Sequence, residues 1–213
     1  MTLQEYVDSL KGRRIAVLGI GVSNTPLIDL LLKNDLPLTV CDMRTEEALG
    51  DAAAALRARG AQLRLGPGYL DDLDGFDYIF RTPGLLPTDP ALVKAKARGA
   101  VVTSEMEIFF RLCPCRTIGI TGSDGKTTTS SIIAELLKAA GRRVHLGGNI
   151  GKPLLCEIPD FQPDDIAVLE LSSFQLHSIN IRPDVAVITN VSPNHLDKHP
   201  DFDDYVNAKR QIF

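Results

Sequence analysis

The run TGSDGKTTT at residues 121–129 has the composition of a phosphate-binding loop. Gly122 and Gly125 let backbone N–H groups converge on phosphate oxygens. Lys126 supplies a mobile cation for the outer phosphates, and Thr127 offers a hydroxyl to a magnesium ion. The run therefore predicts the binding of a nucleoside triphosphate. The alternative is a glycine-rich turn at the start of an ordinary helix, and the flanking segments argue against it.

The loop departs from the strict pattern G-x-x-x-x-G-K-[ST]. That pattern would place glycine at position 120, where this chain has Ile120, and the glycines stand at 119 and 122 instead. The residues predicted to surround the nucleotide are Gly122, Ser123, Asp124, Gly125, Lys126, Thr127 and Thr128.

Further candidate residues follow the predicted strands of the same half of the chain. The run GGNIG at 147–151 contains Asn149 and suits close approach to a ligand, although it is equally consistent with a plain loop. Glu170 ends an apolar strand, where a carboxylate can hold magnesium opposite the phosphate loop. His195 lies just past the next strand and is a candidate metal or substrate contact, whereas a histidine in a loop is usually incidental.

LSSFQL at 171–176 continues the element that carries the glutamate. We expect Phe174 and Leu176 to belong to the core rather than to contact a ligand. For His177 and His199 the sequence offers no comparable argument.

These residues need strands and helices to position them, and the chain alternates between the two throughout. Residues 1–112 predict a Rossmann-like domain with a parallel sheet. Its strands are expected at 14–19, 38–41, 62–65, 77–80 and 100–102, and its helices at 26–33, 46–59, 89–98 and 105–112.

Residues 113–213 predict a P-loop-type α/β ATPase domain that is only partly present. Its strands are expected near 117–120, 143–146, 166–171 and 185–190, and its helices at 130–140 and 202–213. The fold class is therefore α/β, with two domains. The second is small for a nucleotide-binding domain, so we expect the sequence to be part of a longer protein.

The first domain has its own glycine-containing loop, GIGVSN at 19–24, between a strand and a helix. The third glycine of G-x-G-x-x-G would fall at position 24, which is Asn24. The loop is therefore a structural turn, an NAD site or a site for another nucleotide. In the last case a diphosphate would meet Val22 and Ser23, and a base or ribose would meet Asp42 and Arg44.

The composition excludes several classes of protein. The 213 residues are 44% hydrophobic and 23% charged with a net charge of −4, so no basic excess favours nucleic acid. No apolar run approaches membrane-spanning length and no export signal begins the chain, so we expect a cytoplasmic protein without a membrane partner. The four cysteines are expected to be reduced and structural.

Together, the runs TGSDGKTTT, GGNIG, ELSSFQL, NVSPNHLDKH and YVNAKRQIF resemble the Mur ligases along nearly the whole chain. ELSSFQL is most similar to the members that add D-glutamate. The resemblance implies that ATP phosphorylates the carboxylate of UDP-N-acetylmuramoyl-L-alanine and that the amine of D-glutamate attacks the acyl phosphate. It also implies that Thr127 and Glu170 hold a first Mg²⁺.

By the same resemblance, His195 binds a second Mg²⁺ and Lys209 is a carbamylated lysine that completes that site. Lys126, His195 and Lys209 would then be catalytic. Carbamylation requires a neutral amine, so the resemblance predicts a sheltered Lys209. The positions that it assigns to the UDP substrate are Gly21, Val22, Ser23, Asp42, Met43, Arg44, Pro83, Gly84 and Asn149.

Most of the D-glutamate site and the adenine contacts would lie beyond residue 213 in such an enzyme. We therefore expect this chain to bind the UDP substrate without completing the ligation, and the full-length protein to be a monomer. An NAD-dependent oxidoreductase and a P-loop ATPase without a UDP-linked substrate are the alternatives.

Overall fold

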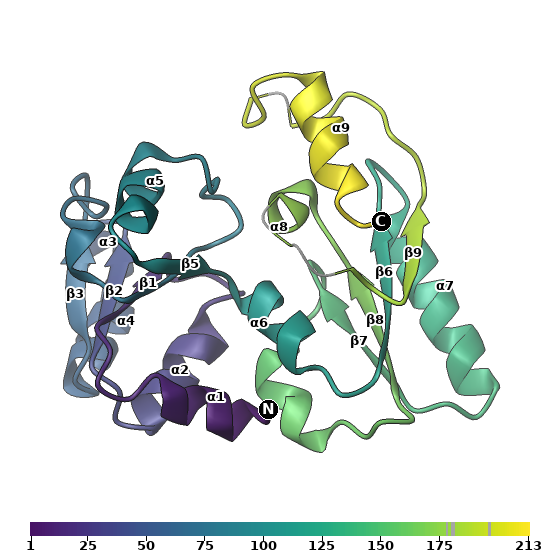
Figure 1. Cartoon of the computed structure of the whole chain (residues 1–213), viewed down its shortest axis with the longest axis horizontal. Helices are drawn as coiled ribbons and strands as arrows, with labels where there is room; N and C mark the ends of the chain where they lie inside the picture. Colours follow the sequence, from purple (N-terminus) through teal and green to yellow (C-terminus); the bar gives the residue numbers. More distant parts are fainter. Residues whose placement is uncertain (178, 180–181, 196) are drawn as a thin grey trace. The chain divides into compact units, whose positions relative to one another are not determined.

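The computed structural model describes residues 1–177, 179, 182–195 and 197–213. The chain forms two compact units, Met1–Glu105 and Met106–Phe213, each with its own parallel sheet (Figure 1). The boundary lies a few residues before the predicted one between 1–112 and 113–213, because residues 106–112, all of the next helix except its first residue, group with the second unit. One reason is the ring of Phe109, whose centroid lies 6.2 Å from that of Phe161 in an edge-to-face contact.

Helices and strands alternate along the first unit, as the sequence pattern predicts. Its elements are α1 (Leu3–Ser9), β1 (Ile15–Leu18), α2 (Thr25–Lys33), β2 (Leu38–Asp42), α3 (Glu46–Leu49), α4 (Asp51–Ala58), β3 (Gln62–Leu65), η1 (Leu73–Gly75), β4 (Tyr78–Phe80), α5 (Pro90–Ala97) and β5 (Val101–Thr103).

The strands of the first unit form one parallel sheet in the order β3-β2-β1-β4-β5. All four residues of β1 are buried, as expected for a central strand covered by helices on both faces. The chain winds outward in one direction from β1 to β3 and in the other from β4 to β5. Ligands of such open sheets bind beyond the carboxyl ends of the strands where this direction reverses, here between β1 and β4.

The second unit begins with a helix and then alternates in the same way. Its elements are α6 (Glu105–Leu112), β6 (Arg116–Thr121), α7 (Lys126–Ala139), β7 (Val144–Gly148), η2 (Leu155–Asp160), β8 (Ile166–Glu170), α8 (Ser173–Leu176), β9 (Val185–Ile188) and α9 (Phe202–Arg210).

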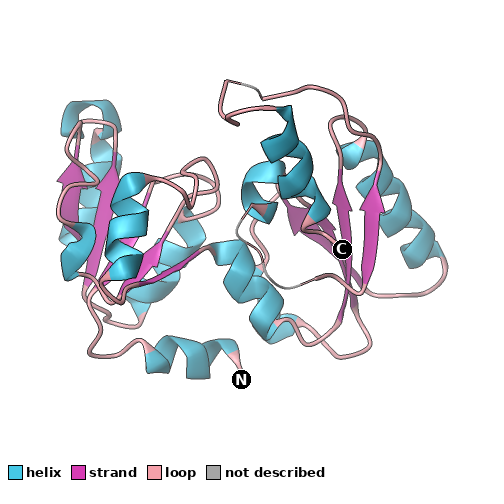
Figure 2. Ribbon diagram, turned by 45° about the horizontal axis from the view of Figure 1, so that its top comes forward, coloured by secondary structure: helices cyan, strands magenta, loops and turns pink. Residues whose placement is uncertain are grey.

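The parallel sheet of this unit has the order β7-β8-β6-β9. β8 lies directly beside β6, with Glu170 in register with Ile120, so the tip of β8 meets the start of the phosphate loop. α7 packs on the sheet through an apolar cluster that includes Ala134 and Val168. α8 and α9 lie side by side, and in both views they are on the other side of the strands from α7 (Figure 2).

The prediction of a single continuous helix over residues 46–59 is wrong. The expected helix at 46–59 is two helices, α3 and α4, separated by Gly50 with φ = 53°. That left-handed value ends the hydrogen-bonded run, and glycine adopts it without the penalty of a Cβ. In the parts of the chain that the structure describes, none of the helices is long and apolar enough to cross a membrane.

Candidate active site

The phosphate loop connects β6 to α7, as the sequence predicts. Its backbone explains why glycine stands at 122 rather than 120. Ile120 is fully buried within β6, whereas Gly122 has φ = 153° immediately after the strand. A Cβ at Gly122 would overlap the hydroxyl of Thr189 and lie 3.1 Å from the carbonyl oxygen of Asn190. The close approach of two backbone segments therefore requires glycine at this position.

The loop is held by residues that follow β9. The amide of Ser123 donates to the carbonyl of Asn190 at 3.0 Å, and the amide of Asp124 donates to the Asn190 side chain at 3.1 Å. The buried hydroxyl of Ser123 donates to the carbonyl of Ser192 at 2.8 Å and lies 2.9 Å from the Tyr205 hydroxyl. These contacts fix the loop before any ligand binds, which is the preorganisation that a phosphate site needs.

Thr127, Glu170 and Asn149 form a connected group where α7 begins. The Thr127 hydroxyl donates to Glu170 Oε2 at 2.7 Å, and Asn149 Nδ2 donates to Glu170 Oε1 at 3.0 Å. Glu170 is only 2% exposed. Among the described residues no basic side chain forms an ion pair with it, so its buried charge is met by neutral groups alone.

Two lysines converge on one carbonyl oxygen of the loop. Lys126 Nζ donates to the carbonyls of Gly122 at 2.9 Å and Ser123 at 2.8 Å, and Lys209 Nζ donates to the same Gly122 oxygen at 2.8 Å. Lys209 is 2% exposed, which confirms the predicted shelter. Burial, and next the charge of Lys126, lower the pKa of Lys209 to about 8.

The predicted residues of the second unit surround one cavity of about 190 Å³. Lys126, Asn149, His195 and Lys209 all contribute to its wall. The full lining is Gly122, Lys126, Asn149, Ser172, Ser173, Phe174, His195, Tyr205 and Lys209. Segments up to 87 residues apart thus meet beside the phosphate loop.

His195 is exposed and has φ = 55°, a left-handed conformation that is uncommon for a residue with a Cβ. Its ring lies 5.3 Å from that of Phe174. Leu176 is buried as predicted, whereas Phe174 is half-buried and lines the cavity, so the expected core position is confirmed for Leu176 and not for Phe174. Its place in a short helix beside the cavity, rather than in the strand, accounts for the difference.

The first unit has a separate constellation at the carboxyl ends of its central strands. Asp42 is 4% exposed and accepts hydrogen bonds from the amides of Ile20 at 2.7 Å and Arg44 at 2.9 Å. The Arg44 guanidinium also binds both carboxylate oxygens, at 2.9 and 2.8 Å. Burial opposes the charge, but these bonds outweigh it and lower the pKa of Asp42 to about 2. Asp42 therefore braces the loop after β1.

The remaining predicted residues of this constellation lie on loops. Gly21, Met43 and Gly84 are exposed, with Met43 at 71%, and Val22 is 74% exposed. Ser23 and Pro83 are half-buried. Val22 and Met43 thus present large apolar side chains to solvent from these loops.

Asn24 and Arg81 support these loops, and the sequence did not predict either role. Asn24 Nδ2 donates to the carbonyls of Leu18 at 2.8 Å and Gly19 at 3.1 Å, so it closes the turn where a dinucleotide loop would carry its third glycine. The buried Arg81 donates to carbonyls of the turn after β4, the nearest being that of Leu85 at 3.0 Å. The one feature of the sequence that could have indicated the role of Arg81 is its position directly before the T-P-G turn at 82–84.

Two family models match the chain. The Mur ligase MurD-like N-terminal domain matches residues 13–104, and the Mur ligase middle domain matches residues 120–213. The two matched segments correspond to the two units of the structure, and together they include all the candidate site residues.

Curated relatives match along the whole chain. The "UDP-N-acetylmuramoylalanine--D-glutamate ligase" of Clostridium novyi (strain NT) is 49% identical over 212 residues, which are 100% of this chain and 46% of the relative. The protein of the same name from Clostridium kluyveri (strain ATCC 8527) is 50% identical over 209 residues, 98% of this chain and again 46% of the relative. The chain thus spans about half the length of the curated relatives it matches.

A solved structure has the same fold. The UDP-N-acetylmuramate:L-alanyl-gamma-D-glutamyl-meso-diaminopimelate ligase from Neisseria meningitides aligns with a TM-score of 0.54 and 21% identity. The alignment covers 94% of this chain and 67% of that protein. At this identity the likeness establishes the α/β architecture and nothing about the substrate.

Proposed function

Because the chain belongs to the Mur ligase family, we propose that it forms part of an ATP-dependent ligase that adds D-glutamate to UDP-N-acetylmuramoyl-L-alanine in peptidoglycan precursor synthesis. The observation that carries the proposal is the cavity beside the phosphate loop, in which Lys126, His195 and Lys209 meet. The names of the relatives that are about 50% identical support the choice of substrates.

The reaction needs a carboxylate to become an acyl donor. A carboxylate is a poor electrophile, and transfer of the terminal phosphoryl group of ATP gives it a leaving group. The amine of D-glutamate then attacks the acyl carbon, an amide bond forms, and phosphate leaves with the electrons of the broken C–O bond. Lys126 lies where its charge would stabilise the negative charge that accumulates on the transferred phosphoryl group.

Thr127 and Glu170 fit a Mg²⁺ ion. Their oxygens lie 2.7 Å apart at the start of α7, and hydroxyl and carboxylate oxygens are the hard ligands that Mg²⁺ prefers. Mg²⁺ bound there would neutralise phosphate charge during transfer. The buried Glu170 carboxylate, bonded to neutral groups, is suited to receive a cation.

Lys209 and His195 fit a second cation site only if Lys209 carries a carboxylate. We propose that Lys209 becomes carbamylated: its neutral amine attacks CO₂, a C–N bond forms, and one proton is released. The buried environment that lowers the pKa of Lys209 to about 8 supports this step, because a substantial fraction of the amine is neutral near pH 8.

In the first unit we propose a site for the UDP portion of the substrate, at the loop after β1 and the turn after β4. Gly21, Val22 and Ser23 lie in the loop after β1. Met43 and Arg44 follow β2 and are exposed, and the Arg44 guanidinium donates to the Ile20 carbonyl of that loop at 2.6 Å. Asp42 acts through Arg44 by holding the loop and the guanidinium together. Asn149 is assigned to the substrate carboxylate end, because it lines the cavity of the second unit.

Calorimetric titration of the chain with UDP-N-acetylmuramoyl-L-alanine, ATP with Mg²⁺, and NAD tests the proposal. We expect binding of the first two ligands and none of NAD. NAD binding would support an oxidoreductase, and ATP binding without any UDP-ligand binding would support a P-loop ATPase of another kind. Turnover by this chain alone with D-glutamate would refute the view that further residues are needed.

A further inference from the structure

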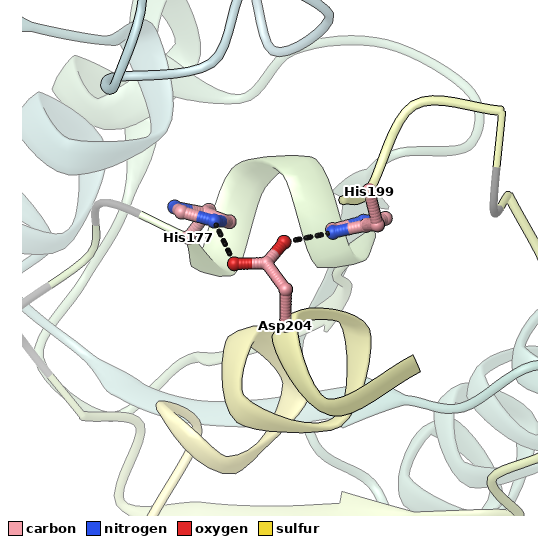
Figure 3. Close-up of side chains that lie close together, drawn as sticks. All are labelled: His177, His199 and Asp204. Atoms are coloured by element: carbon pink, nitrogen blue, oxygen red, sulfur yellow. Dashed lines mark hydrogen bonds and ion pairs between the residues drawn. The ribbon is translucent and has the colours of Figure 1, made fainter. Parts of the chain in front are cut away.

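A buried histidine joins two helices beside the cavity. His199 is 2% exposed, and its Nδ1 lies 2.6 Å from Asp204 Oδ2 on α9. Its Nε2 lies 2.9 Å from the hydroxyl of Ser173 on α8. The other carboxylate oxygen of Asp204 is 3.1 Å from His177 Nε2, so one carboxylate is held between two imidazoles (Figure 3).

The ring of His199 also packs between aromatic side chains of both helices. It stacks on Phe174 with ring centroids 5.0 Å apart and an interplanar angle of 12°. Tyr205 meets it edge-on at 5.2 Å and 76°. His199 therefore contacts α8 and α9 through both polar and apolar groups, which makes it a connection between them rather than a surface residue of either.

The same three side chains, His177, His199 and Asp204, have ligand atoms within 4.8 Å of one another and so resemble a metal site. Their hydrogen bonds argue for a different role. Both ring nitrogens of His199 and both oxygens of Asp204 already have partners at 2.6–3.1 Å. A metal ion would have to displace the bond between the buried His199 imidazole and the Asp204 carboxylate, and hydrogen bonds to charged groups are costly to break.

α9 carries the two side chains that reach the phosphate loop. Tyr205 lies 2.9 Å from the Ser123 hydroxyl, and Lys209 donates to the Gly122 carbonyl at 2.8 Å. Asp204 is the neighbour of Tyr205 in sequence, and Lys209 is one helical turn further along the same face. Any rotation or displacement of α9 at Asp204 would therefore move both contacts.

We propose that His199 is a positioning residue, which ties α9 to α8 through Asp204 and Ser173 and so sets the placement of Tyr205 and Lys209 against the phosphate loop. The importance of His199 for ligation rests on the proposed function. The placement of Tyr205 and Lys209 by His199 does not depend on that function. No catalytic step is assigned to His199.

Two substitutions of the same side chain separate its two hydrogen bonds. The amide nitrogen of asparagine can take the place of the histidine Nδ1, and that of glutamine can take the place of Nε2. His199→Asn should therefore retain the bond to Asp204, and His199→Gln should retain only the bond to Ser173. Asp204→Asn weakens the connection from the other side without a change of volume.

His145 provides a matched control in the same unit. Its Nε2 lies 2.8 Å from Asp165, and its ring stacks on Phe161 with centroids 3.6 Å apart. His145→Asn removes an equivalent bond from a half-buried imidazole that is not part of the cavity wall. A general loss of stability would affect this variant in the same way as the His199 variants.

The first measurement is the rate at which an amine-reactive acylating reagent labels Lys209 at pH 8, followed by mass spectrometry. The second is hydrogen–deuterium exchange of residues 202–210. In His199→Gln and Asp204→Asn we expect about tenfold faster labelling and faster exchange. The first variant loses a hydrogen bond to a charged group and the second loses the charge that strengthens it, and either loss corresponds to about that change in local opening. His199→Asn should remain close to the wild type, and His145→Asn should not alter Lys209 labelling.

Wild-type labelling and exchange in folded His199→Gln and Asp204→Asn would overturn the proposal, as would equal effects in His145→Asn. If one of the two variants fails to fold, the other decides. Calorimetry with ATP on the same samples distinguishes failure of the proposed function from failure of the positioning role of His199. If the wild type fails to bind ATP, the proposed function fails while the labelling result still reports on the positioning role.

Discussion

Replacement of Lys209 by methionine should stabilise the second unit near neutral pH. Methionine keeps most of the unbranched hydrocarbon of lysine and removes a charge that is 2% exposed. The pKa of Lys209 is about 8 in the folded chain against 10.5 for an ordinary lysine. At about 1.4 kcal/mol per pH unit, this difference corresponds to about 3 kcal/mol of unfavourable free energy for the charged form.

The sign of the pH dependence follows from the number of bound protons. Between pH 8 and 10.5 the unfolded chain keeps a proton on Lys209 that the folded chain has released. The free energy of unfolding of the wild type therefore rises with pH across this window. Lys209→Met has no such contribution, so its advantage of about 3 kcal/mol at pH 7 should shrink toward zero near pH 10.5.

Urea unfolding followed by circular dichroism, at pH 7 and pH 10 in CO₂-free buffer, measures this difference. Carbon dioxide must be excluded because a carbamate would make the wild-type side chain anionic. Lys138→Met is the control, since Lys138 lies exposed on α7 beside Glu135 and should show no such convergence. A constant difference between Lys209→Met and the wild type at both pH values would refute the assignment of a destabilised ammonium.

Three further substitutions test the loops. Asp42→Asn should lower the free energy of unfolding of the first unit at pH 7 by on the order of 2 kcal/mol, since the folded pKa of about 2 lies below 3.8. This gap should close as the pH falls from about 4 toward 2 in urea titrations, and a gap that persists would contradict the assignment. Gly122→Ala should weaken ATP binding in calorimetry at least about tenfold, because the new Cβ overlaps Thr189. Gly141→Ala, with positive φ but open space around the new Cβ, should bind ATP normally, so equal losses in the two variants would exclude steric overlap as the cause. Asn24→Gly completes the dinucleotide pattern but should destabilise the first unit by about 1–3 kcal/mol through loss of two bonds to backbone carbonyls. A gain of NAD binding by this variant would show that Asn24 alone had prevented it.

Local patterns were sufficient to predict most of the fold. The strand before Gly122 and the helix after Lys126 follow from apolar periodicity and loop chemistry that lie within a few residues. The N-terminal α1 went unpredicted, although Thr2 and Glu5 form a capping box there. Gly50 was likewise a visible signal for the break in the predicted helix 46–59, and the apolar periodicity across it obscured that signal.

The position of a candidate site residue could be predicted when the residue lies at the end of a single predicted strand. Glu170 follows from its position at the tip of an apolar strand beside the loop. Contacts between distant segments were not predictable, as the bond between Ser123 and Tyr205 shows, because these residues are 82 positions apart. His199 likewise acquires its neighbours only when α8 and α9 come together, and a histidine in a polar loop gives no signal of that burial.

The charged groups around the phosphate loop favour, on energetic grounds, a ligand that contains both an anion and a cation. Lys126 and Lys209 direct two ammonium groups at the Gly122 carbonyl, and the buried Glu170 carboxylate lies nearby on β8. Across the residues that the structure describes, none of these three groups forms an ion pair, although buried charges are usually paired. An anion would satisfy the two ammonium groups and a cation would satisfy the carboxylate. A magnesium-bound triphosphate, the ligand of the proposed function, would supply both charges, so groups that are costly to keep without an ion pair in the unliganded unit would favour its binding.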